Sequence, residues 1–301
     1  MKYSKQICAY IIALFLVIVM FTSCQKKTET QTAEGAAVVD SVASVDGVMI
    51  HYQVQGSGSP VIVFVHGWCC DRTYWDNQVG YFSDKVKVVT LDLAGHGESG
   101  LNREEWTMNA FGQDVAAVVN KLNLDRVVLV GHSMGGQVIV EAAKRLPGKV
   151  LGLVGVDTFH DLGREWTEEE FEKNIAPFKE NFVETTMDFV RQMYPEGADS
   201  ALVEKIAANM ASAPKDVALG CFYGLFKFDA TAALKEVRLP IISINADMWP
   251  TKVEANQEIA ASFDLILMPG RGHFLMLEDP ETFNANLETA VQKLIKGPPP
   301  G

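Results

Sequence analysis

The chain alternates between short apolar runs and longer segments whose apolar residues recur at helical spacing. The runs predict strands at residues 48–54, 61–65, 86–91, 126–130, 150–156, 240–245 and 264–268. The helical spacing predicts helices at residues 108–122, 134–146 and 283–295. Several of the runs are apolar at nearly every position, as strands buried on both faces require. The alternation therefore predicts an α/β fold, with a mainly parallel sheet flanked by helices.

One long stretch interrupts this alternation. Residues 159–235 are rich in large apolar side chains and contain no convincing strand. Near its start, Thr167-Glu168-Glu169-Glu170 has the spacing of a capping box at the beginning of a helix. We therefore expect a helical cap inserted after the strand at residues 150–156. Its aromatic residues mainly form its own core, and some of them should face a ligand pocket, which favours an apolar acyl or aromatic substrate.

The first 23 residues have the organisation of a secretory signal. Lys2 and Lys5 precede an apolar run at residues 7–21, and Thr22-Ser23-Cys24 follows it. The run is shorter than the roughly 20 apolar residues that a membrane span needs, so an uncleaved anchor helix is the less favoured interpretation. The ending resembles a bacterial lipoprotein cleavage box. That resemblance implies that Cys24 becomes the acylated first residue of the mature chain.

The segments that flank the folded part are polar or rich in proline. Residues 24–37 lack apolar periodicity and predict a flexible tether, and residues 296–301 predict a disordered tail. The folded domain is expected at residues 38–295. Together with the acylated Cys24, this organisation predicts a lipoprotein of the bacterial cell envelope that is anchored to the membrane and faces the periplasm or the cell surface.

Composition and charge narrow the class of protein. The chain is 48% hydrophobic and 21% charged, which is typical of a globular protein with a sizeable core. Its formal net charge of −12 argues against nucleic acid as a partner. We therefore expect a small molecule to be its main ligand, with the lipid anchor as its contact with the membrane.

A candidate nucleophile lies directly after the predicted strand at residues 126–130. Gly131-His132-Ser133-Met134-Gly135 has the form G-x-S-x-G, with a buried strand before it and a helix after it. Such a turn exposes the serine hydroxyl at a helix N-terminus. The alternative is an ordinary glycine-rich turn whose serine caps the helix.

A serine nucleophile needs a base, and the chain supplies one at a suitable place. His273 follows the last predicted strand, and Asp247 follows the strand before it. Strand ends at one edge of a parallel sheet converge, so these residues can meet Ser133. We expect Ser133 as nucleophile, His273 as base and Asp247 as the acid that orients it. Asp157, at the end of the strand at 150–156, is the alternative acid.

These motifs together resemble the α/β-hydrolase superfamily. The resemblance rests on His66-Gly67-Trp68, on the glycine-rich turn after Asp92, and on the Ser133, Asp247 and His273 motifs in that order, and it covers about residues 38–295. It implies a Ser-His-acid triad, no metal and no cofactor. It also implies that the backbone N–H groups of Trp68 and Met134 form the oxyanion hole.

The expected activity is hydrolysis of a small to medium apolar acyl or aromatic ester through an acyl-enzyme. Amide, lactone, thioester or C–C bond hydrolysis, or perhydrolysis, are alternatives on the same triad. An alternative of another class is a catalytically silent binding protein at the cell envelope. The fold alone does not choose among them.

Overall fold

A computed structural model describes residues 37–297 of the chain. The predicted signal at residues 1–23, the lipidation candidate Cys24 and the tether up to residue 36 lie outside the described residues, as do residues 298–301. Within residues 37–297, no single helix has the length and apolar character of a membrane span, although one bent helix pair, Lys215–Phe226 with Ala230–Glu236, meets those criteria jointly.

The described part of the chain contains an eight-stranded sheet with strand order β1-β2-β4-β3-β5-β6-β7-β8. Its strands are β1 (Val38–Ala43), β2 (Met49–Gln55), β3 (Val61–Val65), β4 (Lys87–Leu91), β5 (Val127–His132), β6 (Val150–Val156), β7 (Pro240–Ala246) and β8 (Ser262–Met268). β2 runs antiparallel to both of its neighbours, β1 and β4, and all strand pairs from β4 to β8 are parallel. The mainly parallel sheet predicted from the apolar runs is confirmed.

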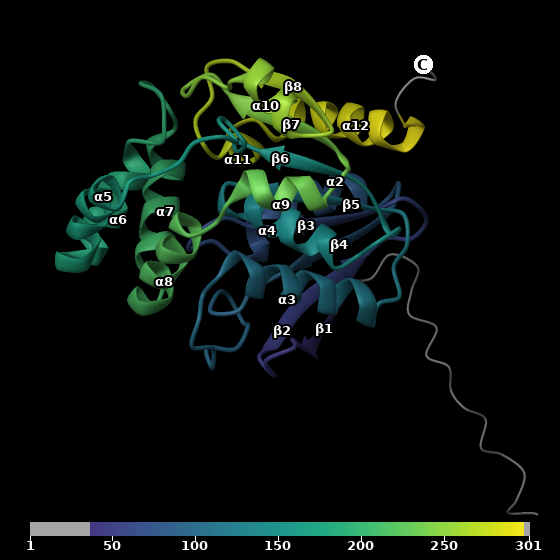
Figure 1. Cartoon of the computed structure of the whole chain (residues 1–301), viewed down its shortest axis with the longest axis horizontal. Coiled ribbons are helices and arrows are strands. Elements are labelled where there is room, and N and C mark those ends of the chain that lie inside the picture. Colours follow the sequence, from purple (N-terminus) through teal and green to yellow (C-terminus); the bar gives the residue numbers. More distant parts are fainter. Residues whose placement is uncertain (1–36, 298–301) are drawn as a thin grey trace, which may run out of the picture. The chain divides into compact units, whose positions relative to one another are not determined.

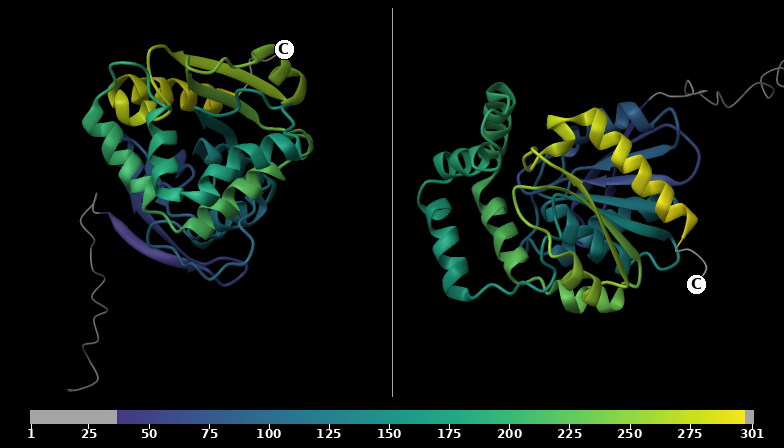
Figure 2. Two further views of the ribbon diagram at one scale, coloured as in Figure 1. Left: turned by 90° about the vertical axis from the view of Figure 1, so that its left-hand side faces the viewer. Right: turned by 90° about the horizontal axis from the view of Figure 1, so that it is seen from above.

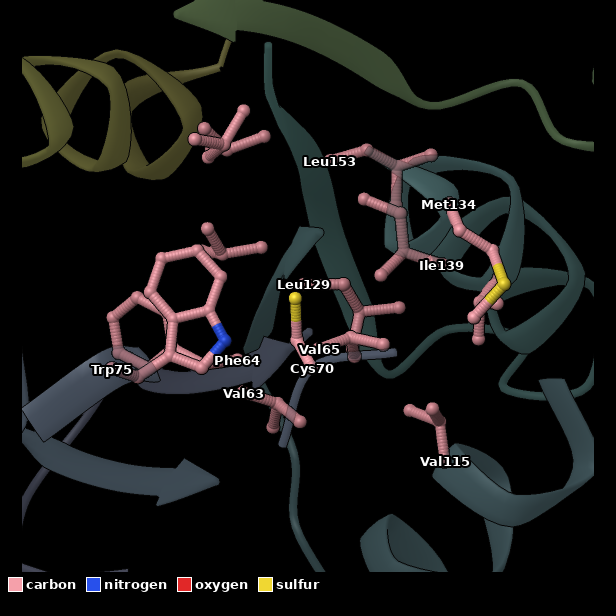
Figure 3. Close-up of a cluster of buried hydrophobic side chains, with 14 of the residues drawn as sticks. Val63, Phe64, Val65, Cys70, Trp75, Val115, Leu129, Met134, Ile139 and Leu153 are labelled. Carbon is pink, nitrogen blue, oxygen red and sulfur yellow. The ribbon is translucent and has the colours of Figure 1, made fainter. Parts of the chain in front are cut away.

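The middle of the sheet is buried on both faces because its strands carry apolar residues at nearly every position. All residues of β3 and β5 are buried. Successive side chains point to opposite faces, so each of these strands supplies two halves of the core. Phe64 lies against Trp75 with ring centroids 4.7 Å apart, and Val115 and Ile139 lie on the other side of the central strands (Figure 3).

Helices cover both faces of the sheet, as Figures 1 and 2 show. One face is covered by α2 (Asp76–Phe82) and α12 (Pro280–Lys296), with the short α11 (Leu275–Glu278) beside them. The other face is covered by α3 (Met108–Lys121), α4 (Met134–Lys144) and α9 (Ala230–Glu236). α10 (Val253–Ile259) packs beside β8, and a 3₁₀ turn, η1 (Arg72–Trp75), precedes α2.

Four helices between β6 and β7 form a cap that lies apart from the sheet in Figure 1. They are α5 (Glu168–Glu180), α6 (Phe182–Arg191), α7 (Ser200–Ala211) and α8 (Lys215–Phe226). The capping box predicted at the start of α5 is present, because the Thr167 hydroxyl accepts from the Glu170 amide and the Glu170 carboxylate accepts from the Thr167 amide. α9 falls within the predicted cap range of residues 159–235 but packs against α4 and α10, so the cap helices end at Phe226.

Candidate active site

Ser133 lies in a strained turn between β5 and α4. Its φ is 51° and its ψ is −118°, a backbone conformation that is rare for any residue except glycine. The turn needs glycine on both sides. A Cβ on Gly131 would lie 2.2 Å from the Gly135 carbonyl oxygen, and a Cβ on Gly135 would lie 2.6 Å from the Val65 carbonyl oxygen. The G-x-S-x-G spacing is therefore a steric requirement of this turn.

His273 lies in the loop between β8 and α11, against a buried carboxylate. Its Nδ1 is 2.6 Å from Asp157 Oδ2. Because a carboxylate only accepts, Nδ1 carries the proton and Nε2 remains free to act as a base. The Asp157 side chain is fully buried, and its Oδ1 accepts from the Ala246 N–H at 2.9 Å. The carboxylate is thus held by one bond on each oxygen.

The carboxylate that meets His273 is not the one preferred from the sequence. Asp247 is exposed, and its Oδ1 accepts from the Gly270 N–H at 2.8 Å in the turn after β8. The prediction of Asp247 as the acid is therefore corrected to the alternative, Asp157. The physical reason is that the chain turns at the end of β6 with a positive φ of 44° at Asp157, while Asp247 is engaged by the Gly270 amide.

The loop after β3 is held in place by a neutral histidine. His66 Nε2 accepts from the Leu93 N–H at 3.0 Å, so Nδ1 carries the proton and donates to the Gly67 carbonyl at 2.8 Å. Burial lowers the pKa of His66 to about 4, which keeps the ring neutral at neutral pH. The Gly67 carbonyl also accepts from the Cys70 N–H at 3.3 Å. Both bonds fix the peptide that carries the Trp68 N–H.

The two amides predicted for the oxyanion hole border the Ser133 turn. A Cβ on Gly67 would lie 3.2 Å from Ser133 Cβ, so the loop that carries Trp68 passes close to the serine. Met134 is the first residue of α4, where a backbone N–H has no acceptor within its own helix. Both candidate donors therefore belong to segments that border Ser133.

The Trp68 side chain joins this loop to the cap. Its Nε1 donates to the Ala218 carbonyl in α8 at 2.8 Å, and its ring stacks on Phe222 with centroids 4.3 Å apart. Phe178 and Phe189 meet the same ring edge-on. Trp68, whose segment borders Ser133, is therefore also the main aromatic contact of the cap.

A cavity of about 80 Å³ lies between the cap and the ends of the strands. Ser133 and His273 both line it. Its other lining residues carry no permanent charge and are mostly large and apolar: Trp68, Cys70, His132, Phe189, Met193, Met210, Phe222, Leu225 and Phe274. A larger hollow of about 350 Å³ lies at the opposite ends of the strands, under α12, and neither Ser133 nor His273 reaches it. The small apolar cavity is therefore the candidate substrate site.

Sequence reasoning missed three groups that hold the His273 loop. Glu278 accepts from the Gly272 N–H through both oxygens, at 3.0 and 2.9 Å. His132 Nε2 donates to the His273 carbonyl at 2.9 Å, and the His273 N–H donates to the Met193 carbonyl of the cap at 2.9 Å. The position of Glu278 soon after His273 is a weak signal, because a carboxylate before a helix is more often a cap.

Known proteins share this architecture. Residues 62–286 match the Alpha/beta hydrolase family. The bifunctional esterase/perhydrolase DCH of Acinetobacter calcoaceticus is 26% identical, over 82% of this chain and 97% of that protein. The esterase EaEST of Exiguobacterium antarcticum has a structure that superposes with a TM-score of 0.75 at 20% identity, over 85% of this chain and all of that one.

A third match is confined to part of each chain. The dihydrolipoyllysine-residue acetyltransferase component of the acetoin cleaving system of Cupriavidus necator is 33% identical over 120 residues. That alignment covers 40% of this chain and 32% of that protein. The family match, by contrast, includes the β3 strand, the Ser133 turn, the cap and the His273 loop. The chain belongs to the alpha/beta hydrolase family.

Proposed function

We propose that this hydrolase cleaves carboxylic esters with short, uncharged acyl groups, using Ser133, His273 and Asp157. The observation that carries the proposal is the 2.6 Å contact between His273 Nδ1 and Asp157 Oδ2, in a loop that places His273 on the same cavity as Ser133. A serine, an imidazole oriented by a buried carboxylate and two nearby amides are the parts that acyl transfer needs.

The proposed reaction proceeds through an acyl-enzyme. Ser133 Oγ attacks the ester carbonyl carbon while His273 Nε2 takes its proton, and Asp157 stabilises the resulting imidazolium. The N–H groups of Trp68 and Met134 bind the oxyanion of the tetrahedral intermediate. His273 returns the proton to the leaving alcohol. A water molecule, deprotonated by the same imidazole, then releases the acid and regenerates Ser133.

The size and lining of the cavity support the substrate class. An apolar cavity of about 150 Å³ is known to bind benzene, whereas the cavity beside Ser133 measures about 80 Å³. With the cap in this position, an acyl chain of a few carbons fits better than an aromatic or long-chain acid. The uncharged lining disfavours an ionised acyl group, since its charge would be buried without a partner.

The relatives support ester hydrolysis and one alternative. The full-length relative from Acinetobacter calcoaceticus is named for both esterase and perhydrolase activity. Perhydrolysis, in which hydrogen peroxide replaces water as the second acceptor of the acyl group, is therefore our second candidate. Both reactions share the acyl-enzyme on Ser133, so the same nucleophile serves either acceptor.

Labelling with a fluorophosphonate tests the proposed nucleophile on the full chain. We expect one covalent adduct by intact mass on the wild type and none on Ser133→Ala. The hydrolysis of p-nitrophenyl acetate, butyrate and octanoate then tests the acyl pocket, and we expect kcat/KM to fall for octanoate. Absence of an adduct on folded wild type would refute the esterase and leave a binding protein as the better account.

We also propose that the enzyme is held at the cell envelope by a lipid on Cys24, which lies outside the described residues. The proposal rests on the basic, apolar and small-residue order of residues 1–24. Expression of Cys24→Ala in a bacterial host, followed by membrane fractionation, tests it. We expect the variant to leave the membrane fraction, and an unchanged distribution would count against lipidation.

A further inference from the structure

A second histidine lies on the far side of Asp157 from His273. Asp157 uses Oδ2 to contact His273, and its Oδ1 lies 3.7 Å from His160 Nε2. Trp249 meets both imidazole rings edge-on, at 6.1 Å from His160 and 5.6 Å from His273. The carboxylate is therefore flanked by two imidazoles, and the proposed mechanism uses only one of them.

Neighbouring side chains determine which nitrogen of His160 carries the proton. Asn245 Nδ2 donates to the Thr158 carbonyl at 3.0 Å and to Thr251 Oγ1 at 2.9 Å. Its Oδ1 accepts from the Thr158 N–H at 3.2 Å, which fixes the orientation of the amide. Thr251 Oγ1 thus already accepts a hydrogen bond, and its own hydrogen is free to donate.

The hydroxyl of Thr251 donates to His160 Nδ1 at 3.1 Å, and Asn245 Nδ2 lies 3.4 Å from the same nitrogen. Asn245 has already donated both hydrogens of Nδ2, so the Thr251 hydroxyl is the donor to Nδ1. The carboxylate of Asp157, which only accepts, faces Nε2 and favours the tautomer with Nδ1 as the acceptor and the proton on Nε2. That Nε2 is buried and has no hydrogen-bond partner among residues 37–297. Its N–H faces Asp157 Oδ1 at a distance longer than a hydrogen bond, so the interaction is electrostatic.

We propose that His160 is a positioning residue whose N–H stabilises the Asp157 carboxylate and thereby lowers the proton affinity of His273. The inference rests on the proposed function, because it concerns the base of the same triad. An N–H dipole at Oδ1 stabilises the carboxylate by itself, so less of its charge is available to stabilise an imidazolium at Oδ2. His273 then stays unprotonated, and competent as a base, to a lower pH.

The other charged groups near His160 do not replace this interaction. The titratable groups that face it are Asp157 and His273, and the charged pair on the same turn is Asp161 with Lys252, whose Nζ–Oδ2 distance is 2.7 Å. The Lys252 N–H donates to the His160 carbonyl at 2.8 Å. Burial lowers the pKa of His160, so its ring is neutral where His273 works as a base.

The pH dependence of fluorophosphonate labelling, measured on the full chain, tests the inference. We expect the acid limb of the labelling rate to move to higher pH in His160→Leu, by on the order of half a pH unit. His160→Gln should restore the wild-type profile, because its amide nitrogen can occupy the place of Nε2. Profiles that coincide for all three proteins would overturn the inference.

Thr251→Val provides a second variant that leaves His160 in place. It removes the hydroxyl donor to Nδ1, so the ring can adopt either tautomer, and we expect a smaller shift in the same direction. In a His160→Leu background the Thr251 change should add nothing further, and an additive shift would contradict the proposed link. This variant also keeps the test decisive if His160→Leu fails to fold.

A measurement that does not depend on labelling separates this inference from the proposed function. Titration of the His273 ring by NMR on the full chain needs neither substrate nor label. If wild type is not labelled but the pKa of His273 rises in His160→Leu, the esterase proposal fails and the positioning role stands. If wild type is labelled and the pKa of His273 is unchanged in His160→Leu, the positioning role fails alone.

Discussion

Backbone amides, more than side-chain partners, hold the carboxylates around His273. Asp157 Oδ1 accepts from the Ala246 N–H of β7, and Glu278 accepts from the Gly272 N–H with both oxygens. These bonds tie the end of β6 and the His273 loop to fixed backbone. The imidazole is therefore oriented through carboxylates that cannot rotate without losing a buried bond.

Glu278 is predicted to matter for activity without touching substrate. Glu278→Ala should lower the fluorophosphonate labelling rate by roughly 10- to 100-fold, because a misplacement of about 1 Å at a catalytic group has an effect of this size. The matched control is the nearby Glu281→Ala. Glu281 is an exposed carboxylate in the first turn of α12, away from the His273 loop, so its loss should leave the rate nearly unchanged. Equal rates for Glu278→Ala and wild type would argue against this role.

The places of Ser133 and His273 at the candidate site could be predicted from the sequence, but the carboxylate that contacts His273 could not. Ser133 and His273 each lie in a motif that has a steric reason, whereas Asp157 and Asp247 both follow strands that end at the same edge of the sheet. What separates them is the left-handed turn at Asp157 and the bond from Gly270 to Asp247. Neither feature leaves a mark on local sequence spacing.

The strands of the sheet interior could be predicted because their apolar runs are continuous, whereas the edge strand β1 could not. β1 was absent from the predicted strands, and its residues are mostly exposed. It pairs only with β2, in an antiparallel register that matches Val38 with Val54. An exposed edge strand lacks the buried pattern by which strands are recognised, so pairing with a distant segment has to define it.

The contact of Trp68 with α8 is predicted to hold the cap in place. Trp68→Phe keeps the backbone N–H and an aromatic ring but loses the bond from Nε1 to the Ala218 carbonyl. We expect the free energy of unfolding to fall by about 1 kcal/mol. Relative to wild type, amide hydrogen exchange should become faster in α8 and stay the same in α4. Hydrogen exchange with mass spectrometry measures both helices in one sample. Unchanged protection of α8 would show that the cap is held by other contacts.

Across the whole molecule, burial favours the neutral form most strongly for His66, His96 and His132. Burial lowers the pKa of His66 to about 4 and of His96 to about 3, and it lowers the pKa of His132 well below its ordinary value. Above pH 6.5 these rings are neutral in both the folded and the unfolded chain. Below it, the unfolded chain takes up protons that the folded chain does not, so stability falls as the pH falls.

The free energy of unfolding should therefore decrease as the pH falls from 7 to 5, above the range in which carboxylates with ordinary pKa values titrate. Each buried ring can contribute up to about 1.4 kcal/mol per pH unit. Denaturant titrations at the two pH values measure the change. His96→Asn, whose amide can still donate to the Ala94 carbonyl that His96 Nδ1 contacts at 3.0 Å, should reduce the slope. A stability that is flat over this range would contradict the account of neutral buried rings.

The paired variants Asp157→Asn and Asp247→Asn decide whether the contact between Asp157 and His273 is the catalytic one. Both changes remove one carboxylate at the end of a strand, and only one of them touches His273. The fluorophosphonate labelling rate of Ser133 should fall by about 10⁴-fold in Asp157→Asn, the size of effect seen when the acid of such a triad is replaced. It should stay within about twofold of wild type in Asp247→Asn. A collapse of the rate in Asp247→Asn, with Asp157→Asn near wild type, would show that the acid is Asp247 and that the contact between Asp157 and His273 is not the catalytic one.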